Sequence, residues 1–306
     1  MASEASATFR AEVLRRDPDA VGWLDHLPTL QWELIRAWHL TPTGPLRYGA
    51  TAAVLPVDSP EGPAALKVIS PFVDAGPEAA ALAAFGGDGA VRMLAADHAR
   101  NALLLEWLDG PDLSTVGDLG AMVRIAGGLA RRLAVAEPDG GPMPRLADGA
   151  AGWREQLLAQ HTEAIDRGDA VDEPSLQRAL RAIEGLAGDS TATVAHGDLA
   201  PSNVRRSVDG RWIAVDPQGV RGTAAFDAHT VVRGRLDTVL SGADPAGQLA
   251  ALTRSFAEAA GVDAGSALEL SFARYVSSYY WESQHQGDPE TVVHLRAATT
   301  IAAHPQ

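Results

Sequence analysis

Hydrophobic residues near the N-terminus recur at the spacing of an amphipathic helix. Leu30, Leu34 and Trp38 fall on one face, with Glu33 and Arg36 on the other. This pattern predicts helical structure over residues 8–40, which would cap the elements that follow.

Between residues 38 and 108 the pattern changes to short apolar runs separated by turns that contain Pro and Gly. Such runs are typical of an antiparallel meander. One helix interrupts it, because Pro77 and Glu78 suit a helix start and Gly86 suits its end. The expected strands cover residues 51–57, 64–69, 90–94 and 102–108. We therefore predict a small lobe over residues 1–110 that ends at a hinge.

Beyond Asp112 the pattern is mainly helical, with two short buried strands at 194–195 and 212–215 and a hairpin turn signal, Asp209-Gly210, between them. The combination predicts an α+β fold whose second lobe covers residues 111–306. The expected helices cover residues 119–135, 153–165, 175–186, 225–232, 245–260 and 267–285, of which the last is rich in aromatic residues.

Composition excludes several classes of function. The 306 residues contain no cysteine, which excludes disulfides, thiol nucleophiles and cysteine zinc sites. The N-terminus lacks a basic and apolar leader, and no apolar run approaches the ~18 residues of a membrane span, so we expect a cytoplasmic protein without a membrane partner. The net charge of −14 argues against nucleic acid and is compatible with a cationic small substrate, although an acidic solvated surface is the commoner cause.

The strongest chemical signal lies in residues 193–204. His196, Asp198 and Asn203 have the H-x-D-x-x-x-x-N spacing of a kinase catalytic loop, and Asp216 follows a second apolar run. A carboxylate such as Asp198 can face an attacking hydroxyl, while oxygens of Asn203 and Asp216 suit Mg²⁺, a hard cation. His196 is expected to pack and hydrogen-bond the loop. The alternative for the whole motif is an Asx-type turn after a buried strand.

Lysine occurs once among 25 basic residues, at Lys67, within the apolar run Ala64–Ile69. An unpaired charge there would be costly unless the residue lies on an edge strand in water. Glu78 follows eleven residues later, at the start of the expected helix, where it could pair with Lys67 or simply complement the helix dipole.

Together, Lys67, Glu78, the His196 loop, Asn203 and Asp216-Pro-x-Gly resemble the protein-kinase-like fold in its small-molecule branch. The chain is most similar to the aminoglycoside and hydroxyurea kinase family, which includes streptomycin 6-phosphotransferases. The resemblance covers about the first 110 residues and roughly 190 to 235, with Trp23-Leu-Asp-His-Leu-Pro, Gly86-Gly-Asp-Gly-Ala-Val-Arg and Leu103-Leu-Leu-Glu-Trp-Leu-Asp-Gly among the shared segments.

The resemblance implies a two-lobed kinase with ATP and Mg²⁺ as cofactors. It implies Asp198 as catalytic base, Asn203 and Asp216 as metal ligands, and Lys67 as the phosphate ligand that pairs with Glu78. The adenine would lie against the hinge at Glu106 and Leu108. The implied substrate is an aminoglycoside-type antibiotic, most of all streptomycin, and we expect a monomer or a weak dimer.

Some positions depart from the family. Ala200 stands where members often carry a His, and the helices over 151–187 match weakly. Hydroxyurea or an amino sugar therefore stays open as the acceptor. Gly197 after the His and the absence of Ala-Pro-Glu after Asp216 argue against a protein kinase.

Two other classes compete with a kinase. A metal-dependent phosphohydrolase could use His196, Asp198 and Asp216, but it has no need of a buried Lys67. A silent nucleotide-binding module would not need every catalytic residue.

The last helical region supplies candidate substrate contacts. Trp281, Glu282 and Asp288 lie together in the sequence, with Glu290 nearby. Carboxylates can form bidentate pairs with the guanidinium groups of a cationic sugar. The alternative is that they are solvated surface charges.

Overall fold

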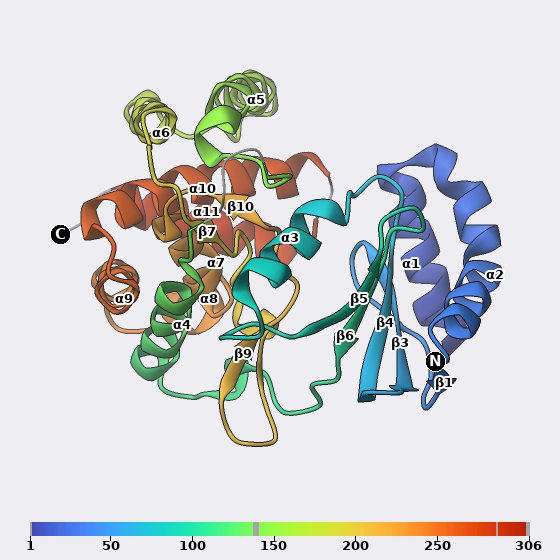
Figure 1. Cartoon of the computed structure of the whole chain (residues 1–306). Coiled ribbons are helices and arrows are strands. Elements are labelled where there is room, and N and C mark those ends of the chain that lie inside the picture. The colour runs from blue at the N-terminus through green and yellow to red at the C-terminus, as the bar shows by residue number, and fades with distance from the viewer. Residues whose placement is uncertain (1, 137–140, 286, 304–306) are drawn as a thin grey trace. The chain divides into compact units, whose positions relative to one another are not determined.

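The chain folds as two units, Met1–Asp109 and Gly110–Gln306, each described below by itself (Figure 1). The computed structural model describes residues 2–136, 141–285 and 287–303. Within these ranges no helix is long and apolar enough to cross a membrane.

An antiparallel sheet forms the centre of the first unit. Its strand order is β1-β3-β4-β6-β5, with β2 paired to β3. The expected meander is therefore present, although the third expected run, residues 90–94, becomes a strand only from Met93. The elements are α1 (Ala2–Arg16), α2 (Val21–Ala37), β1 (Thr41–Pro42), β2 (Arg47–Tyr48), β3 (Ala52–Ser59), β4 (Gly62–Ile69), α3 (Gly76–Phe85), β5 (Met93–Asp97) and β6 (Ala102–Glu106).

Alternation along β4 gives its side chains opposite surroundings. Leu66 and Val68 join the hydrophobic cluster that α1 and α2 form on one face of the sheet. Because neighbouring side chains of a strand point to opposite faces, Lys67 points to the other face, where α3 lies (Figure 1). The sheet thus presents a single ammonium group to α3.

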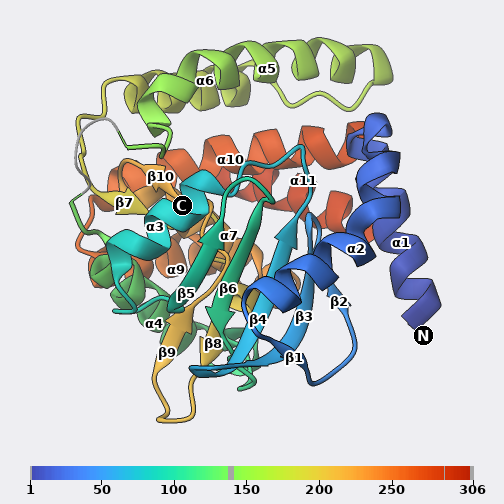
Figure 2. The ribbon, with the colours of Figure 1, turned by 45° about the vertical axis from the view of Figure 1, so that its right-hand side comes forward.

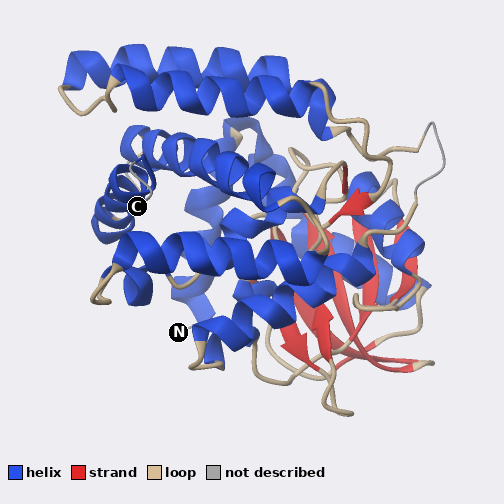
Figure 3. Ribbon diagram, turned by 90° about the vertical axis from the view of Figure 1, so that its left-hand side faces the viewer, coloured by secondary structure: helices blue, strands red, loops and turns tan. Residues whose placement is uncertain are grey.

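Helices form most of the second unit, and the helices in Figure 3 are drawn in blue. The pair α5 and α6 run side by side as an antiparallel hairpin (Figure 2). Gly127 of α4 lies so close to α9 that a Cβ there would meet the Phe256 carbonyl oxygen at 2.6 Å, so only glycine permits this approach. The helices are α4 (Leu119–Leu133), α5 (Leu146–Arg167), α6 (Glu173–Ala187), α7 (Ala228–Arg233), α8 (Leu236–Leu240), α9 (Pro245–Ala260), α10 (Ala264–Gln284) and α11 (Pro289–Ala303).

Two short antiparallel strand pairs lie beside these helices: β7 (Val194–Ala195) with β10 (Val220–Arg221), and β8 (Val204–Arg206) with β9 (Trp212–Ala214). The hairpin turn at Asp209-Gly210 is present, but it joins β8 to β9. The sequence pattern instead places the strand at 194–195 before this turn. The strand β8 has three residues, which are too few for an alternation of apolar and polar positions to be recognised in the sequence.

The C-terminal region also differs from the prediction. The aromatic-rich helix α10 is followed by a further helix, α11, whereas we expected α10 to close the fold. The apolar and polar residues of α11 are poorly separated onto opposite helix faces, so the sequence gives little sign of an amphipathic helix there.

Candidate active site

The loop between β7 and β8 carries the residues of the kinase-like motif. The buried strand β7 leads into His196, the partly buried Asp198 follows, and a short 3-10 turn, Pro201–Asn203, leads into β8. The Asn203 carbonyl accepts from the Val215 N–H at 2.8 Å, which places Asn203 beside the end of β9 and the following Asp216. Two segments more than ten residues apart are thereby joined at one point.

His196 supports this loop from within. Its ring is buried, Nδ1 accepts from the Asp198 N–H at 3.2 Å, and Nε2 lies 3.1 Å from the Val215 carbonyl oxygen. With Nδ1 as acceptor, Nε2 carries the hydrogen and donates. The predicted structural role of His196 is confirmed.

Asp227 fastens the same loop by its backbone. The carboxylate accepts from the His196 N–H at 3.1 Å and from the Gly197 N–H at 2.8 Å. Gly197 has φ +85°, and a Cβ there would lie 3.0 Å from Gln218 Cβ, which explains why glycine stands there. Burial raises the pKa of Asp227 to about 7, against the opposing effects of the Arg274 charge and the two N–H donors.

Asp198 is half-buried and is held by the amide of Asn203. Asn203 Nδ2 donates to the Asp198 carbonyl oxygen at 2.9 Å and to its Oδ2 at 3.2 Å. Burial raises the pKa of Asp198, with a further increase from the negative charge of Asp216, while the positive charges of Arg274 and Arg233 oppose the shift. A carboxylate in these surroundings can orient a hydroxyl and accept its proton.

Asn203 and Asp216 fit a magnesium site in their chemistry. The Asn203 amide uses its nitrogen toward Asp198, so its Oδ1 is the atom left for a cation. Asp216 has φ +61°, a sparsely populated conformation that is found at functional sites. No group of three or more acidic or histidine residues with metal-site geometry occurs in the described part of the chain.

In the first unit, Lys67 and Glu78 form a buried ion pair. Lys67 Nζ lies 2.7 Å from both carboxylate oxygens, and each residue is 7% exposed. Of the alternatives for Lys67, the edge strand is wrong, because β4 lies between β3 and β6. Breaking such a pair by removing one partner leaves an uncompensated buried charge, which is strongly destabilising.

The expected hinge residues lie at the C-terminal end of β6: Glu106 is its last residue, and Leu108 comes two residues later. The Glu106 carboxylate accepts from the Arg92 N–H at 3.1 Å, so its side chain is already engaged. Trp107 N–H donates to the Pro63 carbonyl at 3.1 Å. The backbone N–H and carbonyl of Leu108 bond to none of the residues that the structure describes. They are the backbone groups at this strand end that a ligand could use.

Two hollows of about 320 Å³ lie in the second unit; the first reaches the loop at Asp198 and Ala200, and the second shares Arg233 with the first. The first, which we call the Asp198 hollow, is lined by Asp198, Ala200, Thr230, Arg233, Gly234, Leu236, Asp237, Thr291, His294 and Leu295. The second, the tryptophan hollow, is lined by Trp153, Gln156, Gln160, Phe226, Arg233, Arg274, Ser277, Ser278, Trp281 and Glu282.

The candidate substrate residues near the C-terminus have separate places. Trp281 is 43% exposed and stacks on His285 with ring centroids 3.8 Å apart, and Glu282 accepts from Arg233 at 2.9 Å. Both line the tryptophan hollow. Asp288 lines neither hollow; it accepts from the Thr291 N–H at 2.9 Å at the start of α11.

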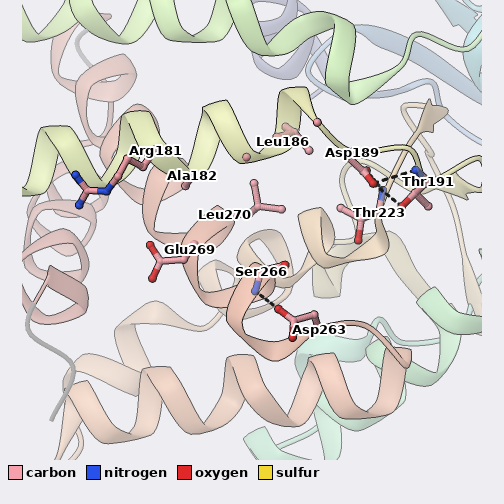
Figure 4. Close-up of a pocket in the computed structure, with 12 residues that line it drawn as sticks. Arg181, Ala182, Leu186, Asp189, Thr191, Thr223, Asp263, Ser266, Glu269 and Leu270 are labelled. Atoms are coloured by element: carbon pink, nitrogen blue, oxygen red, sulfur yellow. Dashed lines mark hydrogen bonds between the residues drawn. The ribbon is translucent and has the colours of Figure 1, made fainter.

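A larger hollow of about 500 Å³ lies between α6 and the first half of α10 (Figure 4). Its acidic side chains already serve the fold. Asp189 accepts from Thr191 and Thr223, and Asp263 accepts from the Ser266 N–H. Glu269 pairs with Arg178. None of the motif residues lines it, so size alone does not identify the active site.

Several residues of the site carry no motif and were missed in the sequence. Asp227, Arg233, Arg274 and His294 reach the loop or its hollows from helices or from the turn before α7. Arg274 offered one signal, because it is a charge within the apolar run Phe272–Val276, as Lys67 is in its strand. Its guanidinium donates to the Phe226 carbonyl at 2.9 Å and stacks over the Phe226 ring, and burial lowers its pKa to about 10.

Sequence comparison places these residues in a known context. The sequence profile of the aminoglycoside/hydroxyurea antibiotic resistance kinases matches residues 37–286. Streptomycin 6-kinase of Streptomyces griseus is 30% identical over 268 residues, which are 85% of this chain and 84% of that protein. Hydroxyurea phosphotransferase of Kitasatospora aureofaciens is 35% identical over 224 residues, which are 71% of this chain and 64% of that protein.

Structural comparison supports the fold. An ethanolamine kinase of Plasmodium vivax superposes with a TM-score of 0.59 and 12% identity, covering 87% of this chain and 83% of that one. The predicted protein-kinase-like fold, with an antiparallel-sheet lobe and a helical lobe, is confirmed.

Proposed function

Because the chain belongs to the aminoglycoside/hydroxyurea antibiotic resistance kinase family, we propose that it transfers the γ-phosphate of ATP to a hydroxyl of an aminoglycoside-type antibiotic, streptomycin first of all. The observation that carries the proposal is Asp198, a half-buried carboxylate that is held by Asn203 and lines its own hollow. We infer that residues 1–110 bind the nucleotide and that residues 111–306 bind the acceptor and catalyse the transfer.

Four residues of the chain take part in this proposed reaction. Asp198 accepts the proton of the acceptor hydroxyl while the acceptor oxygen forms its bond to the γ-phosphorus. The bond from that phosphorus to the β–γ bridging oxygen breaks, and ADP leaves. Lys67, held by Glu78, contacts the nucleotide phosphates, and the Leu108 backbone receives the adenine.

Asn203 Oδ1 and the Asp216 carboxylate would hold Mg²⁺, as their oxygen-only chemistry fits. The ion, when bound, neutralises the negative charge that develops on the phosphate oxygens. The chain's own contribution is to hold these two oxygens beside Asp198 through the Asn203 and Val215 backbone bond.

Two observations bear on the acceptor. The Asp198 hollow and the tryptophan hollow together offer aromatic, amide, hydroxyl and carboxylate groups, which suit a polyhydroxylated ring with cationic substituents. Hydroxyurea is the second candidate, because a hydroxyurea phosphotransferase is 35% identical to this chain. A phosphohydrolase is disfavoured, since it would have no use for the buried Lys67 and Glu78 pair.

The test is a transfer assay with purified protein, ATP and Mg²⁺. Streptomycin, hydroxyurea and an amino sugar are offered in parallel, and products are read by mass spectrometry. We expect streptomycin to gain one phosphoryl group with stoichiometric ADP. Transfer to hydroxyurea alone would replace the acceptor and keep the kinase, while ADP release without any phosphorylated acceptor would favour a phosphohydrolase.

A further inference from the structure

Arg233 is shared by the two hollows. It ends α7 and lines both the Asp198 hollow and the tryptophan hollow. Its Nη2 donates to Glu282 Oε1 on α10 at 2.9 Å, and the two side chains are 34% and 25% exposed. A pair that is partly in contact with water and bound through one oxygen can be exchanged for another partner at modest cost.

Charge makes the tryptophan hollow unsuited to a cation while this pair is closed. Its lining holds two arginines, Arg233 and Arg274, and one carboxylate, Glu282, which gives a net charge of +1. Arg274 is fixed by its bond to the Phe226 carbonyl and its stacking on the Phe226 ring. Arg233 is therefore the positive charge that can leave.

The rest of this lining suits a sugar ring. Trp153 donates from Nε1 to Ser277 Oγ at 2.7 Å, which fixes the indole beside α10. Trp281 is partly exposed, and Gln156 and Ser278 add hydrogen-bonding groups. Flat aromatic faces with a few polar groups bind polyhydroxylated rings. They do not neutralise the charge of a guanidinium group, for which the lining offers the Glu282 carboxylate.

The Asp198 hollow has the opposite balance. Asp198 and Asp237 face one arginine, Arg233, in its lining, together with His294. The charge of Arg233 is close enough to Asp198 to lower the pKa of that carboxyl, against the effect of burial. When the Arg233 guanidinium leaves Glu282, the carboxylates of Asp198 and Asp237 thus offer it a favourable place in the Asp198 hollow.

We propose that a guanidinium or ammonium group of the acceptor replaces Arg233 on Glu282, and that the released Arg233 turns into the Asp198 hollow. Glu282 then selects cationic acceptors, and Arg233 links their binding to the charge beside the reacting oxygens. The inference rests on the proposed function, because it describes how the same site recognises its acceptor.

The exchange predicts that the two partners have opposite effects on KM. In Arg233→Met, Glu282 has no internal competitor, so KM for streptomycin should fall ~3- to 10-fold while kcat falls ~10-fold or more. In Glu282→Gln, KM for streptomycin should rise ~10-fold, because the acceptor loses its charged partner. A structural role for the pair would instead raise KM in both variants.

The pair Arg178 and Glu269 supplies matched controls. It joins α6 to the same helix α10 at 2.8 and 2.9 Å, beside the large hollow of Figure 4. Arg178→Met and Glu269→Gln should leave kcat and KM within about twofold of the wild type, and thermal unfolding of all four variants reports any general damage.

Direct binding separates this inference from the proposed function. Streptomycin titrated calorimetrically into Arg233→Met should bind ~3- to 10-fold tighter than to the wild type, whether or not it is phosphorylated. Weaker or equal binding to Arg233→Met, or unchanged binding to Glu282→Gln, would overturn the exchange. If the wild type transfers no phosphoryl group to streptomycin, the proposed function is overturned, while the exchange is still judged by the binding measurements.

Discussion

Burial of Asp198 determines the pH range in which this residue can accept a proton. Its pKa is raised above the ordinary value of 3.8, first by burial and then by the charge of Asp216. A raised pKa keeps the carboxyl protonated, and so inactive as a base, up to a higher pH than usual. We predict that kcat/KM for the acceptor falls toward acid with a midpoint above pH 3.8, measured in steady-state assays across pH.

The neighbouring charges give this prediction a control. Arg233 and Arg274 oppose the rise, so Arg233→Met should move the acid limb to higher pH. A limb that lies below pH 3.8, or that stays in place in Arg233→Met, would show that another group titrates.

Lys67 allows a second test on one side chain, because the chain contains no other lysine. If Lys67 contacts the nucleotide phosphates, ATP should protect it from amine-reactive reagents. The α-amino group is the internal reference, since its labelling should not respond to ATP. Peptide mass spectrometry would measure both sites, and equal labelling of Lys67 with and without ATP would contradict its assigned role.

At the scale of elements, the loop that carries Asp198 is anchored by a carboxylate that lies 30 residues beyond Gly197. Asp227 accepts from the His196 and Gly197 N–H groups. In Asp227→Asn one oxygen can still accept, while the amide NH₂ faces the second donor. Hydrogen bonds to charged groups contribute ~1.5–3 kcal/mol, so we predict that kcat falls by about 10- to 100-fold.

Asp244→Asn is the matched control for this variant. Asp244 also accepts a backbone N–H, from Gly247 at 2.9 Å, but it caps α9 away from the loop. It should lower the unfolding temperature without lowering kcat. A kcat for Asp227→Asn within twofold of the wild type would mean that the loop does not need this anchor.

The elements differ in how far sequence could predict them. The bounds of α9 agree with the prediction, because Pro245 and Gly261 mark its two ends and its apolar positions are regular. The pairing of β7 with β10 was not predictable, because two-residue strands contain no periodicity and their register depends on the surrounding helices. Motif spacing predicts Asp198 and Asn203 as site residues, whereas Arg233 and Asp227 lie near the loop or its hollow only through the packing of α7 and the turn before it.

At the scale of the whole molecule, charge should influence how the acceptor arrives. The net charge of −14 raises the local concentration of a cation near the protein. Salt screens such attraction beyond ~8–10 Å at physiological ionic strength. We predict that KM for streptomycin rises between low and high salt while KM for ATP changes less, as measured at constant pH and free Mg²⁺. An equal salt effect on both substrates would remove electrostatic attraction from the account.

In the proposed reaction Asp198 acts on the acceptor hydroxyl and not on the nucleotide, and the variant Asp198→Asn separates these two roles. The measurement is the single-turnover rate of phosphoryl transfer to streptomycin, with MgATP affinity determined on the same sample. We predict a loss of ~10²–10⁴-fold in rate, with MgATP affinity within about threefold of the wild type. A variant that transfers at nearly the wild-type rate, or that loses MgATP binding together with activity, would contradict the assignment.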